Sequence, residues 1–270
     1  MTLLEVLKRA AGYLETHGSA SPRLDAEVLL AHSLGIKRLD LYLQFDRQLA
    51  EAELNPFREL TARRGRGEPV AYLTGHKEFM ALDFLVTPEV LVPNPDTEVL
   101  VQRAVEWGRS RPGPLRFVDI GTGSGCIAVA VAHYLPEATV DAVDLSPAAL
   151  EVARRNVERH AVGDRVHLLE GDLAAPLDGR YDAVLANLPY LPDGVELGRE
   201  VLAQPPIALF AGPELVNRLL AELPRLLAPA GIALLEIDPA ITGELKLEGL
   251  GGSRIHKDLG GHDRVLESWI

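Results

Sequence analysis

The residues with the most specific chemistry follow a predicted strand at Tyr181–Ala186 and read Asn187-Leu188-Pro189-Tyr190. An amide or aromatic amino nitrogen is a poor nucleophile because its lone pair is delocalised. Asn187 Oδ1 and the backbone carbonyl of Leu188 could each accept one N–H from such a nitrogen, which would orient it toward an electrophile. Pro189 stiffens the turn, and Tyr190 can cover the planar acceptor. The tetrapeptide predicts transfer of a group to an NH2 nitrogen; a strand-end turn without chemistry is the alternative.

A second candidate site is a glycine loop at the carboxyl end of another predicted strand. Asp119 stands at the strand end, and Gly121, Gly123 and Gly125 follow. Glycines let the backbone turn sharply and approach a ligand, because no Cβ stands in the way. The loop is no dinucleotide fingerprint, since Cys126 stands where a third small residue is needed, and it lacks the Gly-Lys-Ser/Thr ending of a P-loop. It predicts a ligand site at the edge of an α/β sheet, with an ordinary strand–helix turn as the alternative.

Two further acidic residues end the next two predicted strands. Asp144 lies about twenty residues after the glycines, where a carboxylate can accept both hydrogen bonds of a ribose diol. Asp172 could accept from an adenine amino group, with Leu173 covering the ring. Such a set favours adenosine with free hydroxyls. Beside an NH2 site it predicts S-adenosylmethionine, whose sulfonium methyl is the electrophile, and no strong base is needed because the nitrogen becomes acidic once methylated.

Length and composition set the class of protein. The 270 residues allow one large domain or two smaller ones, and 47% hydrophobic content allows a sizeable core. Lys and Arg number 27 against 39 Asp and Glu, and the net charge of −12 is a poor footprint for a duplex-DNA binder. No apolar run approaches the roughly 20 residues of a membrane span, and the amino terminus is no signal peptide.

The cysteine and histidine content favours the cytoplasm and argues against a zinc site. A single cysteine, Cys126, allows no internal disulfide, and we expect it to be packed in the core. His256 and His262 lack the spacing of zinc ligands, so we expect no metal. We therefore predict a cytoplasmic enzyme that is a monomer and contacts neither a membrane nor nucleic acid directly.

Apolar periodicity predicts helices in the first part of the chain and alternating strands and helices in the rest. Thr2 and Glu5 have capping-box spacing, and Ser21-Pro22 would start the second helix. Later elements are predicted as helices at Leu39–Gln44 and Pro56–Arg64, a β-hairpin at Phe79–Leu82 and Phe84–Val86, a helix from Pro95, strands at Leu115–Ile120, Thr139–Val143, Val166–Leu169, Tyr181–Ala186 and Gly231–Ile237, helices at Ser124–Tyr134, Pro147–His160 and Glu214–Leu227, and a closing hairpin at Ser253–Lys257 and Arg264–Ser268. This is the pattern of an α/β fold with a doubly wound parallel sheet.

With these residues in hand, nearly the whole chain resembles the HemK/PrmC family, which methylates the glutamine of peptide chain release factors. RRGRGEPVAYLTGHKEF resembles the family's linker, and LVPNPDTEVLV resembles its loop entering the catalytic domain. DIGTGSGCIAVA together with Asp144 resembles its S-adenosylmethionine site, and KDLGGHDRVLE resembles its terminal hairpin. The glycine loop occurs in many methyltransferases, whereas the linker and NPDTE are much more specific.

The resemblance implies a class I S-adenosylmethionine-dependent methyltransferase: a Rossmann-like seven-stranded sheet with a small N-terminal helical bundle. It implies a substrate-docking helical domain at 1–68, a β-hairpin linker at 69–92 and a catalytic domain at 93–270. The protein substrate would be the release factor, modified at the glutamine of its Gly-Gly-Gln motif. The implied catalytic residues are Asn187, Leu188, Pro189 and Tyr190. The implied cofactor-binding residues are Asp119, Gly121, Thr122, Gly123, Ser124, Gly125, Asp144, Leu145, Asp172, Leu173 and Asn187.

The chain departs from the family at several positions. Leu188 replaces the first proline of Asn-Pro-Pro-Tyr but keeps its backbone carbonyl, and Asn94 stands where the family has Arg. QPPIALFAGPEL and EIDPA lack the family's Gly-Gly-x-Asp-Gly and Gly-x-x-Gln stretches. Two alternatives stay open from the residues: methylation of an exocyclic amine of a nucleic-acid base, and a weakened paralogue that binds the cofactor without catalysis.

Overall fold

The computed structural model describes residues 1–192, 194–258 and 260–270. The chain divides into two compact units. The bundle unit comprises Met1–His76 and Leu197–Ala203, and the sheet unit comprises Lys77–Glu196 and Gln204–Ile270. The seven-residue segment Leu197–Ala203 thus groups with the N-terminal helices, although it follows the Asn187–Tyr190 turn in the sequence. No helix in the described parts of the chain is long and apolar enough to cross a bilayer.

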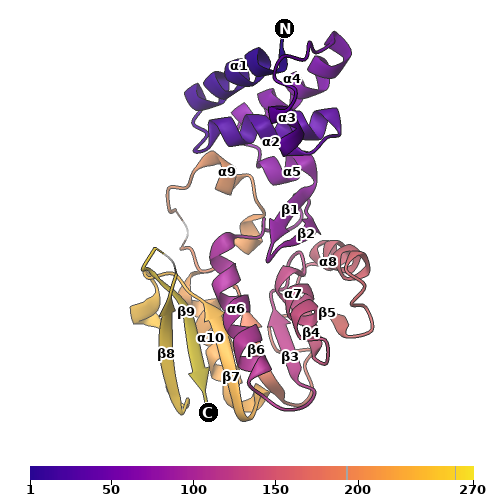
Figure 1. Cartoon of the computed structure of the whole chain (residues 1–270). Helices are drawn as coiled ribbons and strands as arrows, with labels where there is room; N and C mark the ends of the chain where they lie inside the picture. The colour runs from indigo at the N-terminus through magenta and orange to yellow at the C-terminus, as the bar shows by residue number, and fades with distance from the viewer. Residues whose placement is uncertain (193, 259) are drawn as a thin grey trace. The chain divides into compact units, whose positions relative to one another are not determined.

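The bundle unit is helical, as predicted (Figure 1). The predicted capping box is confirmed: Glu5 N donates to Thr2 Oγ1 at 3.3 Å, and Thr2 N donates to Glu5 Oε2 at 2.9 Å. The second helix begins at Pro22, as the Ser21-Pro22 pair predicts. Leucines of several helices form its buried core. The helices of the unit are α1 (Leu3–Thr16), α2 (Pro22–Leu34), α3 (Arg38–Tyr42), α4 (Glu51–Gly65), α5 (Val70–Thr74) and α9 (Arg199–Leu202).

The predicted start of the fourth helix at Pro56 is wrong. Helix α4 begins at Glu51, and the carboxylate of Glu53 accepts from the backbone N–H of Ala50 at 2.9 Å. Capping by Glu53 satisfies one of the free N–H groups of the first turn. Pro56 lies inside the helix, where its missing N–H removes one backbone hydrogen bond near the helix start. The cap therefore determines the helix start, and the proline does not.

The sheet unit contains a seven-stranded sheet with strand order β5-β4-β3-β6-β7-β9-β8. Five strands are parallel, and β9 runs antiparallel to both β7 and β8, as the predicted closing hairpin requires. The order reverses between β3 and β6, and this switch point is where open α/β sheets bind ligands. The strands are β3 (Arg116–Ile120), β4 (Thr139–Asp144), β5 (Val166–Glu170), β6 (Tyr181–Ala186), β7 (Leu227–Glu236), β8 (Gly252–Lys257) and β9 (Asp263–Trp269).

Helices cover both faces of this sheet because the strand residues alternate between two apolar cores (Figure 1). Phe117 faces the core shared with α6 and α7, whereas Val118 and Ile120 face the core shared with α10. The helical elements of the unit are η1 (Pro95–Thr97), α6 (Glu98–Arg109), α7 (Cys126–Tyr134), α8 (Pro147–Arg159), η2 (Pro206–Ala208), α10 (Gly212–Leu226) and η3 (Thr242–Glu244). This is the predicted seven-stranded, Rossmann-like fold of a class I methyltransferase.

The hairpin before the sheet has a different register from the one predicted. Its strands are β1 (His76–Phe79) and β2 (Leu82–Leu85), so Met80 and Ala81 form the turn and the predicted strand Phe79–Leu82 is wrong. Both turn residues have positive φ, 52° and 57°, a conformation that favours glycine or asparagine. Tertiary bonds hold it: Met80 N donates to Glu98 Oε1 at 2.8 Å, and Tyr134 Oη donates to Met80 O at 2.6 Å.

Candidate active site

The glycine loop after β3 is held against the end of β4. Gly121 N and Thr122 N both donate to the carbonyl of Val143 at 2.9 Å. Gly121, Gly123 and Gly125 have positive φ of 76°, 54° and 78°, so each of the three predicted glycines occupies a backbone region that other residues enter at a cost. The sequence pattern therefore corresponds to a real backbone requirement at all three positions.

The three glycines differ in what a side chain would meet. A Cβ on Gly121 would lie 3.0 Å from Leu188 Cδ2, and a Cβ on Gly125 would lie 3.2 Å from Ala153 Cβ. A Cβ on Gly123 would meet no described atom within 4 Å. Gly121 and Gly125 thus permit close packing of the loop, whereas Gly123 borders open space and lines the pocket.

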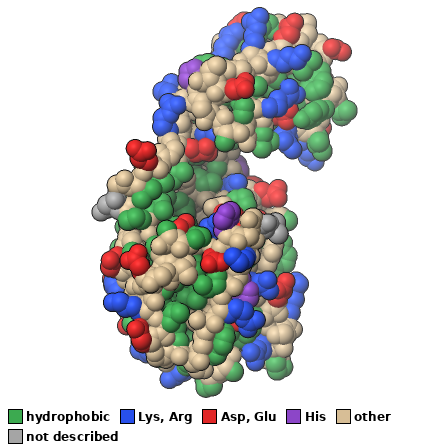
Figure 2. All heavy atoms as spheres, turned by 90° about the vertical axis from the view of Figure 1, so that its left-hand side faces the viewer, with side chains coloured by type: hydrophobic (Ala, Val, Ile, Leu, Met, Phe, Trp, Pro, Cys, Tyr) green, Lys and Arg blue, Asp and Glu red, His purple; other side chains and the backbone are tan. Residues whose placement is uncertain are grey.

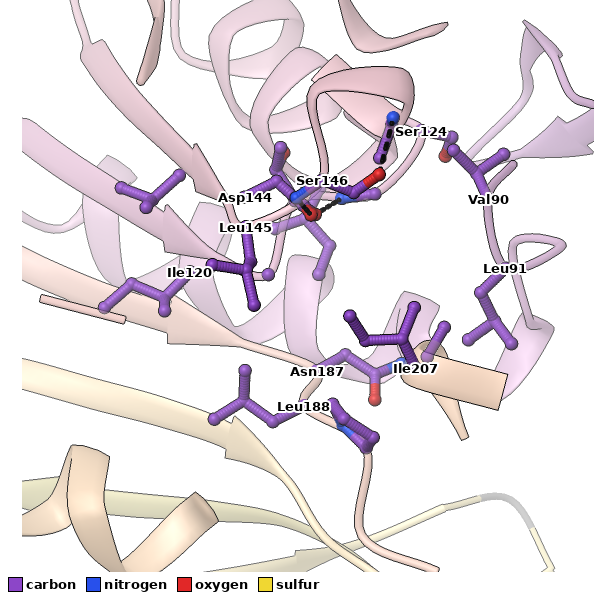
Figure 3. Close-up of a pocket in the computed structure, with 18 of the residues that line it drawn as sticks. Val90, Leu91, Ile120, Ser124, Asp144, Leu145, Ser146, Asn187, Leu188 and Ile207 are labelled. Carbon is purple, nitrogen blue, oxygen red and sulfur yellow. Dashed lines mark hydrogen bonds between the residues drawn. The ribbon is translucent and has the colours of Figure 1, made fainter. Parts of the chain in front are cut away.

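Asp144 organises the loop from the end of β4. Its Oδ2 accepts from Gly123 N at 2.8 Å, and its Oδ1 accepts from Ser146 N at 2.9 Å. Figure 3 shows Asp144, Leu145 and Ser146 on one side of the pocket, with Asn187 and Leu188 on another side and Val90 and Leu91 on a third. A carboxylate offers about four lone-pair positions, so both oxygens keep acceptor capacity for a ligand.

One pocket brings the predicted groups together. Its lining includes most of the predicted cofactor residues together with the turn after β6: Gly121, Thr122, Gly123, Ser124, Asp144, Leu145, Asp172, Leu173, Asn187, Leu188 and Pro189. Residues that were not among the predicted site residues also line it: Glu89, Val90, Leu91, Val92, Pro93, Asn94, Thr97, Ser146, Ala149, Ile207, Ala208 and Leu215, among others. The described lining contains acidic side chains but no Lys, Arg or His.

Three of the predicted site residues do not line the pocket. Asp119 is fully buried, and its Oδ2 accepts from Thr122 Oγ1 at 2.6 Å and from Ala128 N at 3.2 Å. Burial raises the pKa of Asp119 to about 7. Gly125 is the N-cap of α7, and Tyr190 packs against the core on the α10 side. Asp119 and Gly125 therefore act on the shape of the loop.

Asp172 lines the pocket with part of its carboxylate already engaged. Its Oδ2 accepts from Arg218 Nη2 at 2.6 Å, in an ion pair whose two side chains are about half exposed. Leu173 beside it is buried and adopts a positive φ of 50°. The adenine contact of Asp172 stays a prediction. Arg218 bonds to Oδ2, so Oδ1 would be the oxygen that accepts from the adenine amino group.

The Asn187-Leu188-Pro189-Tyr190 turn leaves β6 at the same edge of the sheet. Asn187 Nδ2 donates to Thr97 Oγ1 at 3.0 Å. The side chain of Leu188 is buried in the core, while that of Tyr190 is partly buried. Burial and the charges of Glu236 and Asp238 raise the pKa of Tyr190 to about 12, so its hydroxyl stays neutral at physiological pH.

Thr97 is a functional candidate that the sequence did not single out. It lies in the NPDTE loop, at the end of η1, and is 2% exposed. Asn94 caps that turn by accepting from Asp96 N at 3.1 Å, and Arg264 of the terminal hairpin pairs with Asp96 at 3.2 Å. The sequence indicates this loop only by its resemblance to the family's LVPNPDTEVLV stretch, and no local signal pairs it with Asn187.

Asn156 of α8 is a second residue without a sequence signal. Its Nδ2 donates to Ser124 O at 2.8 Å and to Leu85 O at 2.9 Å, and its Oδ1 accepts from Leu85 N at 2.8 Å. It therefore ties the glycine loop to β2. Cys126 is buried as expected, and burial raises the pKa of its thiol to about 12, which makes it a packing residue at physiological pH.

Solved structures of other methyltransferases share this fold. A methyltransferase from Pyrococcus furiosus has a TM-score of 0.52 at 20% identity, covering 77% of this chain and 98% of that one. The T. thermophilus 16S rRNA methyltransferase RsmC, solved with AdoMet and guanosine, has a TM-score of 0.53 at 18% identity and covers 72% of this chain and 49% of that one. At these identities the likeness shows the fold alone.

Sequence comparisons identify the family. The PrmC N-terminal domain family matches residues 5–75, and the methyltransferase small domain family matches residues 97–234. The release factor glutamine methyltransferase of Rhodopirellula baltica is 43% identical over 98% of this chain and 95% of that protein. Its counterpart in Moorella thermoacetica is 44% identical over 88% of this chain and 86% of that protein. The chain belongs to the release factor glutamine methyltransferase family.

Proposed function

We propose that this protein transfers the methyl group of S-adenosylmethionine to the side-chain amide nitrogen of the glutamine in the Gly-Gly-Gln motif of peptide chain release factors. The observation that carries the proposal is that the glycine loop, Asp144 and the Asn187-Leu188-Pro189 turn line one pocket. Its cofactor-side residues and its amide-accepting residues thus face a shared space. A release factor as substrate places the reaction in the cytoplasm, where translation ends.

The chemistry of the pocket lining fits S-adenosylmethionine. Glu89, Asp144 and Asp172 are acidic, and no basic side chain belongs to the described lining. A phosphorylated nucleotide would meet only negative charge there, whereas a cationic sulfonium with a free ribose would not. Asp144 would accept from the ribose hydroxyls, and Leu145 and Ile207 supply exposed apolar surface for a flat base. When bound, the cofactor supplies an electrophilic methyl group.

The residues of the turn supply orientation. Asn187 Oδ1 and the Leu188 carbonyl accept the two N–H bonds of the glutamine side chain, which aims the nitrogen at the methyl carbon. A new C–N bond forms as the methyl–sulfur bond breaks, and the methylated nitrogen then loses a proton to water. Acceptance by two oxygens favours the positive charge that the nitrogen develops. Tyr190 is neutral at physiological pH, and it packs against the core on the α10 side instead of lining the pocket.

The charge distribution favours a protein substrate over a nucleic acid. The bundle unit carries equal numbers of basic and acidic residues, so the whole formal charge of −12 belongs to the sheet unit. On the face drawn in Figure 2, basic side chains are interspersed with acidic ones. Nucleic-acid binding depends on several Lys and Arg contacts to phosphates, and an acidic sheet unit opposes it.

Methyl-labelled S-adenosylmethionine tests the proposal when a release factor, its Gln→Ala loop variant and tRNA are offered in parallel. We expect label in the release factor alone and none in its variant. Label in tRNA would move the assignment to a base amine. Cofactor binding without label in any acceptor would identify the protein as a paralogue that has lost catalysis.

A further inference from the structure

The side chain of Asn187, which follows β6, contacts the buried side chain of Thr97 in η1. Asn187 Nδ2 donates to Thr97 Oγ1 at 3.0 Å. The carboxyl of Glu236 lies close enough to the Thr97 side chain for that side chain to lower its pKa, against the larger effect of burial. Thr97 and Glu236 are each 2% exposed. Glu236 ends β7, Thr97 ends η1 and Asn187 follows β6, so three separate elements contribute to this Glu236–Thr97–Asn187 chain.

The number of available protons decides which way the Asn187 amide faces. Burial raises the pKa of Glu236 to about 7, so its carboxyl is ionised above that pH. An ionised carboxylate only accepts hydrogen bonds, and a hydroxyl has a single proton to donate. If that proton goes to Glu236, the oxygen of Thr97 can only accept. The NH2 half of the Asn187 amide is then the half that meets Thr97, and Oδ1 is left for the pocket that Asn187 lines.

We propose that Thr97, held by Glu236, is a positioning residue that fixes the Asn187 amide with Oδ1 toward the incoming nitrogen. The inference rests on the function proposed above and assigns a role to two residues that do not themselves touch the reacting atoms. Without the Glu236 acceptor, the Thr97 hydroxyl donates to Asn187 Oδ1 instead. The amide then presents NH2 to the NH2 of the substrate, and two donors cannot hydrogen-bond.

The loop that carries Thr97 is fixed by contacts within the protein itself. Arg264 pairs with Asp96 at 3.2 Å, and the same guanidinium pairs with Asp258 at 3.0 Å. The Arg264 side chain is 13% exposed, which reduces competition from water. Asn94 caps the turn. Thr97 is therefore in place before any substrate binds, as electrostatic preorganisation requires.

Matched variants test the role of the hydroxyl. Thr97→Val keeps the side-chain shape and removes the hydroxyl, so we expect kcat to fall roughly 10- to 100-fold, with little change in the Kd for S-adenosylmethionine. Thr97→Ser keeps the hydroxyl and should restore kcat to near the wild-type value. Glu236→Met removes the acceptor and should lower kcat as Thr97→Val does, whereas Glu236→Gln keeps an acceptor oxygen and should retain activity.

A double-mutant cycle separates positioning from general structural damage. In an Asn187→Ala background there is no amide to orient, so Thr97→Val should cause no further loss of kcat. An equal loss in both backgrounds, or an unchanged kcat in Thr97→Val, would overturn the positioning role. The proposed function fails separately, if the wild-type protein transfers no methyl group to a release factor.

Hydrogen exchange of the Asn187 side-chain amide tests the bond to Thr97 without an activity measurement. In nitrogen-15 spectra, its side-chain NH2 signals are assigned by their loss in Asn187→Ala. We expect slow hydrogen exchange of these protons in the wild type and in Thr97→Ser, and fast exchange in Thr97→Val. Fast exchange already in the wild type would contradict the bond to Thr97, whether or not the enzyme methylates a release factor.

Discussion

At the scale of single residues, the backbone and the side chain of Leu188 have different roles. Its carbonyl is the proposed acceptor, while its side chain is 5% exposed and packs toward Gly121. The resembling family places proline at this position, which offers the same carbonyl. The reaction therefore depends on the backbone, and the side chain contributes to the core.

Leu188→Pro should change kcat little and lower stability. The carbonyl is kept, but the lost packing against the core should cost roughly 1–2 kcal/mol of unfolding free energy. Steady-state methyl transfer and denaturant unfolding measure the two effects. A large gain in kcat would instead show that leucine impairs the site, as the weakened-paralogue alternative holds.

Gly121 and Gly123 form a matched pair of loop positions. Alanine at either position takes up a left-handed conformation that costs about 1–2 kcal/mol. Gly121→Ala should also displace Leu188 and so lower both thermal stability and kcat, because its Cβ would lie 3.0 Å from Leu188 Cδ2. Gly123→Ala meets no protein atom but borders the pocket, so it should mainly weaken the affinity for S-adenosylmethionine. Calorimetric titration measures the affinity for S-adenosylmethionine, and thermal unfolding measures the stability of each variant. If Gly121→Ala and Gly123→Ala changed affinity and stability equally, the two glycines would not have these different roles.

At the scale of elements, the ends of β3 and β7 each bury a carboxyl group. Burial raises the pKa of Asp119 and of Glu236 to about 7, with bonds from Thr122 and Thr97, respectively, acting in the opposite direction. Arg264 lowers and Asp96 raises the pKa of Glu236. In the unfolded chain both groups titrate near pH 4. The folded state therefore binds these protons more tightly than the unfolded state does.

The free energy of unfolding should fall as pH rises from about 4 to about 7. The contribution of each carboxyl is fully present below its unfolded pKa and is lost as pH rises through its folded pKa, by on the order of 3 kcal/mol per group. Glu236→Gln should flatten the profile between pH 5 and 8 as followed by denaturant unfolding. Asp258→Asn is the control. Hydrogen bonds from His262 and Arg264 lower the pKa of Asp258, so its carboxyl does not titrate between pH 5 and 8. An unchanged slope in Glu236→Gln would contradict a raised pKa.

The elements themselves were largely predictable, because hydrophobic periodicity reports burial directly. Strand β6 has the predicted bounds Tyr181–Ala186, and the helix predicted from Pro147 begins there as α8. Local rules failed where tertiary bonds decide the conformation. Met80 and Ala81 form a turn without glycine because Glu98 and Tyr134 hold it. Helix α4 begins at Glu51, where a cap outweighs the proline signal.

At the scale of the whole molecule, the sequence predicts which strand ends meet but not which side chains pair. Parallel topology brings Asp144 and Asn187 to one edge, and so their shared pocket could be anticipated. Thr97 lies in the NPDTE stretch, far from Asn187 in the chain, and no local signal pairs the two, so their hydrogen bond needed the structure. The grouping of Leu197–Ala203 with the bundle unit likewise has no local signal.

The most direct test of the central claim locates the transferred methyl group. A release factor is incubated with S-adenosylmethionine and either the wild-type protein or Asn187→Ala, and its peptides are then sequenced by mass spectrometry. We predict one methyl group on the glutamine side chain of the Gly-Gly-Gln peptide with the wild type. We predict that Asn187→Ala reduces this methylation to a small residual level. A methyl group on any other residue, or full methylation by Asn187→Ala, would contradict the assignment of Asn187 as the residue that orients the glutamine amide.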